Sequence, residues 1–516
     1  MKPTRSLVAA LLVASTVAGC GTEATVDTST PRRGGELVVA SMPTALDPVY
    51  STLRSNWLAA ATMCEGLWEN DSRMGVHNGL AEDYQYDGAT TYTVRLRAGV
   101  VFHDGQPLRA GDVAASLRRY AGSSPGATFG KILERVSAVD DLTVAIELKQ
   151  PSSAVPALLA TPDTAAYIMP ASLVADVPSK KPLPRITCTG PYQLREFVPD
   201  RQVVLDRFDG YQPRSEPSDG GASGAKTAYA DSVRFVPYNE SNVLNQLRTD
   251  AVDIAPSGPL MDQLPSYQRD DKLNPVVVPG GQFRLMQFNL KQGPATNPKL
   301  RQAVQRALDP KQIALQSLGS PENFLDDSSM FLSTSPWYSP AGKEVYKAAP
   351  DVDGARRLLA ESGYDGSPLR VLYRPNRDPH AELVRQQLRA AGITVELQAT
   401  DETSFTSRRS DPSQWDMFLA TGTSYSDPLT VVFLSSGFPG WWNTPEKNAL
   451  LNRILSAADE PGRQAAWQEL QKLIWTDLPF VKLGFEGNLA VTSTRIGGFA
   501  PSLGTVRGFY NIWLGH

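Results

Sequence analysis

The sequence predicts an α/β protein, because short strands of alternating polarity are interspersed along it with amphipathic helices. In residues 91–97 apolar side chains occupy every second position, and residues 142–148 repeat this pattern. Each segment is therefore expected to be a strand with one face on a core. We find no internal repeat in the chain, which excludes solenoids and propellers.

Helices with recognisable ends are concentrated in the later part of the chain. Asn297 is expected to cap a helix that opens with Pro298, and Asp309-Pro310 to begin a second helix that stops near Gly319. Both carry apolar side chains at the spacing of one helix face. These segments predict two consecutive helices packed on the same core.

The same signals recur further along the chain. Asp378-Pro379 predicts the start of a helix, Gly392 its end, and residues 393–398 the strand that follows. Apolar residues between 466 and 474 form one more helical stripe, which Pro479 terminates. Residues 213–226 are rich in Pro, Ser and Gly and are expected to form a surface loop.

The length and composition describe a soluble protein of several packed units. A chain of 516 residues is too long for one compact core, so two or three units are expected. It is 41% hydrophobic and 20% charged, with a formal net charge of −4. A chain with net negative charge is not expected to present the basic surface that attracts polyanions, so nucleic acid is excluded as an expected partner.

The N-terminus predicts an export leader. Lys2 and Arg5 precede a short apolar run that is too short to span a bilayer, and small residues lead to Cys20. The segment Val17-Ala18-Gly19-Cys20 resembles the lipobox of bacterial lipoproteins. This predicts a signal peptide over residues 1–19, a lipid anchor on Cys20 and a tether over residues 20–33. The alternative is a plain leader with an incidental cysteine.

Two further cysteines, Cys64 and Cys188, remain after export. An oxidising compartment would allow them to form a disulfide. Two buried free thiols are the alternative, because sequence alone cannot place their Cα atoms within bridging distance. We leave this choice open.

Catalytic and metal-binding signatures are missing. The four histidines are scattered, none lies in a His-Glu-x-x-His motif, and no Gly-x-Ser-x-Gly elbow is present. Residues 220–227 nearly match a phosphate loop but carry Ala225 where the motif needs Gly. We therefore predict no catalytic residues, no metal and no cofactor.

Several blocks of sequence stand in a fixed order along the chain. The longest block, residues 91–105, ends in Val101-Phe102-His103-Asp104-Gly105, where Phe102 is expected in the core and His103 in a structural role. Other blocks are residues 64–68, 79–84, 189–192, 252–255, 288–289, 300–310 and 355–364. In their order over about residues 34 to 516, these blocks resemble the peptide/nickel class of binding proteins for ABC importers, family 5.

The resemblance implies a periplasmic-binding-protein-like fold of class II, cluster C. It consists of two large lobes joined by two hinge crossings, with an extra small α/β lobe. The expected boundaries are residues 34–70, 187–280 and 484–516 for lobe I, 71–186 for the small lobe and 281–483 for lobe II. The ligand would bind between the large lobes, where closure removes water from polar contacts.

Both charged groups that grip peptide termini in such relatives are displaced in this sequence. The position of the ammonium-binding Asp is Ser424, with Asp427 nearby, and the position of the carboxylate-binding Arg is Val371, with Arg374 nearby. Asp427 and Arg374 are candidate substitutes. A turn role for Asp427 and a surface role for Arg374 are the alternatives.

The remaining candidate ligand contacts come from segments that resemble cleft-lining loops. In lobe II these are Tyr425 and the aromatic cluster that ends in Trp441, Trp442 and Asn443, with packing of one tryptophan into the lobe as the alternative. In lobe I they are Ser51, Thr52, Leu53 and Arg54, where relatives offer a strand edge to an extended ligand.

The expected function is that of a monomeric, lipid-anchored binding protein facing the periplasm or cell exterior. It would capture an oligopeptide or peptide-like small molecule and deliver it to the permease subunits of an ABC importer, contacting the membrane only through its lipid. One alternative is a ligand-loaded partner of a membrane sensor with the same fold. Another is an extracellular hydrolase, which the missing motifs disfavour.

Overall fold

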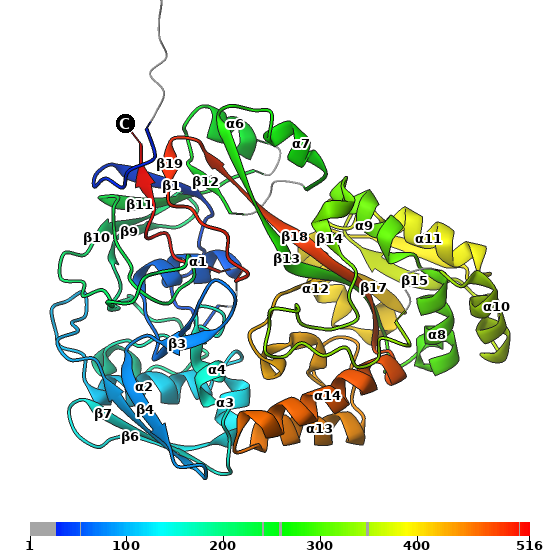
Figure 1. Ribbon diagram of the computed structural model, residues 1–516, viewed down its shortest axis with the longest axis horizontal. Helices are drawn as coiled ribbons and strands as arrows, with labels where there is room; N and C mark the ends of the chain where they lie inside the picture. The colour runs from blue at the N-terminus through cyan, green and yellow to red at the C-terminus, as the bar shows by residue number, and fades with distance from the viewer. Residues whose placement is uncertain are drawn as a thin grey trace, which may run out of the picture.

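The computed structural model of the protein describes residues 27–51, 53–239, 242–256, 261–346, 350–504 and 506–515. The predicted leader, Cys20 and residues 21–26 of the tether lie outside these residues, as does Thr52. The fold is mixed α/β, as predicted, and Figure 1 shows two bodies joined by a long pair of strands.

One large sheet runs through both bodies, in the order β16-β15-β17-β13-β18-β12-β1-β11-β10-β9, with β14 paired to β18. Its strands are β1 (Glu36–Ala40), β9 (Tyr192–Val198), β10 (Gln202–Arg207), β11 (Ser232–Val236), β12 (Ile254–Ala255), β13 (Leu273–Phe288), β14 (Phe324–Leu325), β15 (Leu369–Tyr373), β16 (Val395–Ala399), β17 (Met417–Thr423) and β18 (Phe480–Ser493).

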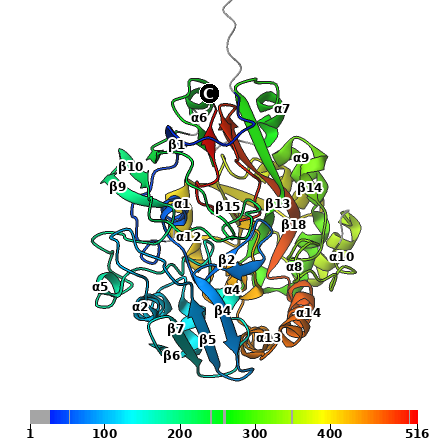
Figure 2. The same ribbon diagram turned by 60° about the vertical axis from the view of Figure 1, so that its left-hand side comes forward.

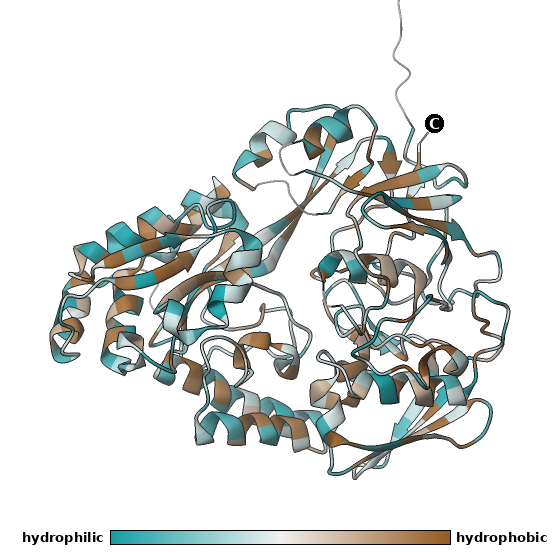
Figure 3. Cartoon of the chain, turned by 180° about the vertical axis from the view of Figure 1, so that it is seen from behind, coloured by the Kyte–Doolittle hydropathy of each residue, from teal (hydrophilic) through white to brown (hydrophobic). Residues whose placement is uncertain are grey.

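Lobe II is the body around β15, β16 and β17. Alternate residues of β17 enter different cores: Met417 and Leu419 join one apolar cluster, and Phe418 and Ala420 join another. Its sheet is therefore covered on both faces, and Figure 3 shows polar and apolar segments alternating around the outer helices. The helices are α8 (Pro298–Ala307), α9 (Pro310–Leu318), α10 (Val352–Glu361), α11 (Ala381–Ala390), α12 (Glu402–Arg409), α13 (Pro445–Ser456) and α14 (Glu460–Asp477).

Lobe I and the small lobe form the other body. The small lobe contains an antiparallel sheet in the order β4-β5-β7-β6, against which α2 packs. Its elements are β4 (Ala81–Tyr86), β5 (Thr91–Leu96), α2 (Ala110–Ala121), α3 (Ala127–Ile132), β6 (Leu133–Ala138), β7 (Thr143–Leu148), α4 (Val155–Leu159) and α5 (Ala171–Val174). The remaining elements are α1 (Arg54–Met63), β2 (Trp68–Asn70), β3 (Val76–Asn78), β8 (Ala160–Thr161), α6 (Val243–Arg248), α7 (Leu264–Tyr267), β19 (Ile496–Gly497) and β20 (Trp513–Leu514).

The two long strands β13 and β18 form the connection between the bodies. They pair antiparallel from Leu273 opposite Ser493 to Gln287 opposite Phe480, with two irregularities in register. Figures 1 and 2 show this ribbon passing from one body into the other. The predicted lobe boundaries at 280/281 and 483/484 fall inside these continuous strands, so the crossings belong to the sheet itself. The exact lobe boundaries stay a prediction.

The predicted helix ends in residues 297–319 are confirmed. The Asn297 side chain accepts a hydrogen bond from the Lys299 N–H, and Asp309 caps α9 in the same way through Gln312. Gly319 follows α9 in the left-handed conformation, with φ of 66°. Local capping chemistry was sufficient to place these ends.

Helix α11 begins differently from the expectation. α11 starts at Ala381 rather than at Pro379, because the Asp378 carboxylate accepts hydrogen bonds from the backbone and side chain of Arg374 and so does not cap the helix. In α2, Asp112 lies inside the first turn and accepts from the Arg109 N–H. Asp112 therefore supports the helix from its third position, the acidic half of a capping box.

The loop of residues 213–226 contains no helix or strand, as expected, but its end is not at the surface. Ala222 and Ser223 are buried, and the Lys226 ammonium, 2% exposed, forms ion pairs with Glu65 and Glu69. The expectation of a surface loop was wrong for this end. A buried ammonium needs a counter-charge, and the carboxylates that supply it come from a distant part of the chain.

A disulfide bond joins Cys64 to Cys188. It ties the end of α1 to the segment that returns from the small lobe, across a sequence separation of 124 residues. His103 lies against this crosslink: the Cys188 N–H donates to His103 Nδ1 (3.3 Å), and Nε2 is 3.1 Å from the Gly190 carbonyl oxygen. A neutral ring with its proton on Nε2 satisfies both contacts.

This geometry predicts that His103 makes folding stability depend on pH. Burial lowers the pKa of His103 to about 4, whereas the unfolded value is 6.5. Between these values the unfolded chain binds the extra proton, so stability is lost as the pH falls from 6.5 towards 4. Urea unfolding of wild type and His103→Gln should show about 2–3 kcal/mol less pH-dependent loss in the variant. Parallel curves for the two proteins would contradict this.

Candidate functional site

Three cavities lie at or near the boundary between the two bodies. The hinge pocket, about 40 Å³, lies beside the connecting ribbon; the Ser424 pocket, about 10 Å³, lies at the end of β17. The third, the large cavity, is an open space of about 1,130 Å³ between lobe I, the small lobe and lobe II. The walls of the hinge pocket all fall within the expected bounds of lobe I, whereas the other two cavities take walls from both bodies. A solute bound in the large cavity would therefore contact both bodies.

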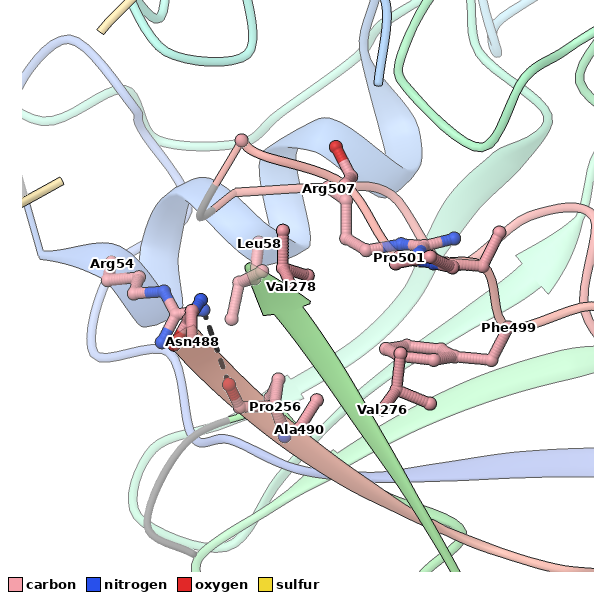
Figure 4. Close-up of a pocket in the computed structure, with 13 residues that line it drawn as sticks. Arg54, Leu58, Pro256, Val276, Val278, Asn488, Ala490, Phe499, Pro501 and Arg507 are labelled. Carbon is pink, nitrogen blue, oxygen red and sulfur yellow. Dashed lines mark hydrogen bonds between the residues drawn. The ribbon is translucent and has the colours of Figure 1, made fainter. Parts of the chain in front are cut away.

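The hinge pocket is built on the first turn of α1 and on the connecting strands (Figure 4). Its walls include Arg54 and Leu58 of α1, Val278 of β13, Asn488 of β18 and Arg507. Of these five residues, Leu58 and Val278 are apolar. The other residues that line the pocket are mostly apolar too: Pro256, Val276, Ala490, Phe499, Ala500, Pro501, Ser502 and Gly504. The pocket is therefore apolar with positive charge at its edge.

Arg54 supplies part of that positive charge. One guanidinium nitrogen donates to the Pro256 carbonyl oxygen at 3.3 Å, as Figure 4 shows. Burial is the main cause that lowers the pKa of Arg54 to about 10; Tyr238 opposes this shift, and the charge of Arg377 on lobe II adds to it. Arg54 still carries its charge at neutral pH. Arg377 is a lobe II cation that the sequence analysis did not select.

The Ser424 pocket holds two of the predicted ligand contacts. Ser424 Oγ donates to the Gly280 carbonyl oxygen at 2.8 Å, which attaches the end of β17 to the turn in β13. The Tyr425 ring lies 6.3 Å from Phe283, and burial raises the pKa of its hydroxyl. The other walls are Arg73, Met74 and Leu503 on one side and Met330, Phe331, Leu332, Thr334, Ser335 and Phe485 on the other.

The large cavity lies between helices of all three lobes. Trp57 of α1 is one of its walls, one helical turn beyond Arg54, so α1 contributes to both this cavity and the hinge pocket. The small lobe contributes Lys131 of α3 and Asp163, and lobe II contributes residues 428–439 and part of α13. Outside these walls, the Ser153 N–H donates to the Ala457 carbonyl oxygen at 2.9 Å, which is a direct contact between the small lobe and lobe II.

Arg374 and Asp427, the two predicted charge substitutes, are bound to internal partners. Asp427 is 0% exposed and accepts from Arg463 at 2.5 Å, while capping the Leu429 N–H. Arg374 contacts two carboxylates, those of Asp378 and Glu402, at 3.2 Å each. Neither residue lines the three cavities. Both charges are already neutralised inside lobe II.

The aromatic cluster also packs within lobe II. Trp442 is buried and donates to Asp477 at 2.8 Å, and Trp441 stacks on Trp415 with ring centroids 5.6 Å apart. Asn443 is exposed and accepts from Asn448. These residues lie outside the walls of the three cavities, although Phe438 and Pro439 of the same segment line the large one.

The lobe I candidates are divided. Arg54 lines the hinge pocket, Leu53 is 54% exposed before α1, and the Ser51 hydroxyl accepts from the Asn56 amide at 2.6 Å. Thr52 lies outside the described residues. The structure therefore brings Arg54, Ser424 and Tyr425 to the cavities between the bodies. Asp163 and Lys131 also line them, and no motif in the sequence marks these two.

Neither a membrane span nor a metal site is found in the part of the chain that the structure describes. No helix there is long and apolar enough to cross a bilayer. No group of three or more His, Cys, Asp or Glu side chains there could hold a metal ion.

Comparisons with known proteins agree with this architecture. The family model of bacterial extracellular solute-binding proteins, family 5 (middle), matches residues 75–442. A probable peptide ABC transporter periplasmic-binding protein of Sinorhizobium fredii is 28% identical over 481 residues, covering 88% of this chain and 89% of that protein. The glutathione-binding protein GsiB of Pectobacterium atrosepticum is 28% identical, with 90% of both chains covered.

Solved structures share the fold at lower sequence identity. A dipeptide-binding protein of Pseudoalteromonas in complex with Met-Leu superposes with a TM-score of 0.77 at 21% identity, covering 93% of this chain and all of that one. The oligopeptide-binding protein AppA of Bacillus subtilis, in complex with a nonapeptide, gives 0.75 at 21% identity, covering 94% and 100%. At this identity the likeness establishes the fold.

The buried Asp427–Arg463 pair predicts a stability phenotype. Asp427→Asn would remove the buried counter-charge of the Arg463 guanidinium and leave only the partly exposed Glu460 beside it, at a cost of about 3 kcal/mol in the free energy of unfolding. Chemical denaturation followed by circular dichroism measures this. Asp411→Asn is the matched control, because Asp411 caps a short helix at the surface and should cost about 1 kcal/mol or less. Equal losses in the two variants would show that the buried pair is unimportant.

Proposed function

Because this chain belongs to the bacterial extracellular solute-binding proteins of family 5, we propose that it is an exported lipoprotein that captures a peptide-like solute between its lobes and delivers it to an ABC importer. Membership of this family makes it a binding protein rather than an enzyme, which removes the extracellular hydrolase from consideration. The peptide-like class of the solute is suggested by the names of relatives that bind dipeptides, oligopeptides and glutathione.

The observation that carries this proposal is the β13–β18 ribbon together with the cavities beside it. Lobe II is entered through β13 and left through β18, and both strands pair along their length. Such a ribbon can bend while keeping its hydrogen bonds, so the bodies can close on a solute held in the gap. A closed complex would differ in shape from the empty protein, which is what an importer needs to distinguish them.

The described walls of the cavities lack the two charged side chains that hold the ends of a peptide in relatives, so their charges favour a ligand that is bound in another way. Ser424 is neutral and hydrogen-bonded to Gly280, and the carboxylate of Asp427 is held by Arg463. Arg54 contributes a cation at the hinge pocket. We therefore propose Arg54, Ser424 and Tyr425 as ligand contacts. We assign structural roles to the other candidates in lobe II, which are Arg374, Asp427, Trp441, Trp442 and Asn443.

The lipid anchor and the importer partnership rest on sequence and family. The lipobox-like residues 17–20 support the anchor, and the family supports an importer over a membrane sensor as the partner. We also propose that the exported part of the chain is a monomer. Its lobe boundaries are then expected at residues 70/71, 186/187, 280/281 and 483/484. Mass spectrometry of small molecules that co-purify with the protein would identify the solute class directly.

Replacement of Ser424 tests the binding site. Ser424→Trp would fill the Ser424 pocket and should abolish the thermal stabilisation that a co-purifying solute gives to wild type, because a ligand that binds only the native state raises its melting temperature. Ser407→Trp, at an exposed position of α12, is the control and should respond like wild type. A full thermal response from a folded Ser424→Trp protein would reject Ser424 as a ligand contact.

Replacement of Cys20 tests the anchor. In a lipoprotein-processing host, the wild-type protein should incorporate a labelled fatty acid and sediment with membranes, since a lipidated N-terminus partitions into a bilayer. Cys20→Ala should lose the label and move to the soluble exported fraction, while Cys64 and Cys188 remain unlabelled in their disulfide. Membrane sedimentation that survives the substitution would exclude Cys20 as the anchor.

A further inference from the structure

Asp163 is the one carboxylate among the described residues that line the three cavities between the bodies. The walls of the hinge pocket and the Ser424 pocket contain arginines but no acidic side chain, and the large cavity contains Asp163 and Lys131 as its charged residues. Among the described residues, neither Lys131 nor another cation acts on the Asp163 carboxylate. The acidic group therefore stands in the cavity wall without a protein counter-charge.

The contacts of Asp163 leave its charge uncompensated. Its Oδ2 accepts one hydrogen bond, from Asn70 Nδ2 at 2.9 Å. Asn70 is neutral and 2% exposed, and its own Oδ1 has no hydrogen-bond partner. Burial raises the pKa of Asp163 to about 6, which is the response of a carboxylate that loses water and gains no cation.

The backbone around Asp163 fixes the position of the carboxylate. The Ala165 N–H donates to the Pro162 carbonyl oxygen at 3.2 Å, and Thr164 Oγ1 donates to the Ala160 carbonyl oxygen at 3.1 Å. Trp57 and Tyr120 line the same cavity and supply apolar surface beside it. A rigid charged group next to aromatic walls is suited to bind a small molecule through one polar contact and apolar packing.

Other acidic groups near the lobe II wall are already occupied. Asp427 is bound to Arg463, and Glu460 lies 3.2 Å from the same guanidinium. Ser424 stands at the position where a carboxylate is expected from the family resemblance. A cationic solute group held in these cavities would thus meet its counter-charge on the small lobe rather than on lobe II.

We propose that Asp163 binds the protonated amino group of the captured solute, so that the ligand is an amine-bearing, peptide-like molecule anchored on the small lobe. This inference rests on the proposed function. An ammonium at Asp163 would provide the missing counter-charge and hydrogen-bond donors in a partly desolvated site, where such contacts are strong.

Retention of defined peptide mixtures tests this assignment. Wild-type protein stripped of bound solute by mild denaturation and refolding is incubated with a tetrapeptide library with free amino termini and with the same library N-acetylated; peptides retained after gel filtration are identified by mass spectrometry. We expect wild type to retain free-amino peptides and to exclude acetylated ones. Calorimetry on one retained peptide should show Asp163→Asn to be about 30-fold or more weaker, the equivalent of about 2 kcal/mol.

Two further variants separate charge from structure. Asp140→Asn, in a solvated turn of the small lobe, is the matched control and should bind like wild type. Asp163→Glu keeps the charge and should retain the preference for free amino groups. Asp163→Asn should unfold at or above the wild-type temperature, because it removes an uncompensated charge from a half-buried position.

The possible outcomes distinguish failure of the Asp163 assignment from failure of the proposed peptide-like ligand. If wild type retains free and acetylated peptides equally, or if Asp163→Asn keeps the wild-type affinity and preference, the Asp163 assignment is overturned while peptide capture stands. If wild type retains neither library, the proposed peptide-like ligand is overturned and the Asp163 assignment with it.

Discussion

The pairing of β13 with β18 is the constraint on which the rest of the structure depends. These strands carry the chain into and out of lobe II, and their hydrogen bonds make the connection between the bodies part of one continuous sheet. The hinge pocket takes walls from both strands, and the Ser424 pocket lies where β17 meets β13. These two pockets are therefore positioned by the ribbon, whereas the large cavity takes its walls from α1, the small lobe and lobe II, and bending the ribbon would change the distance between those walls.

Charge neutralisation inside each lobe decides which polar groups remain for a solute. Lys226 is balanced by Glu65 and Glu69, Arg119 by Asp47, and Asp427 by Arg463, all at nearly complete burial. A ligand could not bind one member of such a pair without leaving the other member buried and without a counter-charge. Asp163 differs from these residues, because its carboxylate lines the large cavity and accepts its hydrogen bond from the neutral Asn70 side chain.

Local signals in the sequence predicted the secondary structure well where capping alone decides it. The ends of α8 and α9 follow from Asn297, Asp309 and Gly319, whose side chains or conformations act within one turn. Prediction failed at α11 because Arg374, four residues earlier, holds the Asp378 carboxylate that was expected to cap the helix. It failed at residues 222–226 because Glu65 and Glu69, which are remote in the sequence, form ion pairs with a buried Lys226.

The sequence by itself determined the α/β class, the family resemblance and the absence of a recognisable catalytic motif, since these depend on periodicity and on residues adjacent in the chain. Tertiary structure decided which side chains are available to a ligand. Asp427 and Asp163 are both single acidic residues beside a proline in the sequence, yet folding places Arg463 against the first and an open cavity beside the second. Availability depends on counter-charges supplied from remote segments, and only the folded chain brings those segments together.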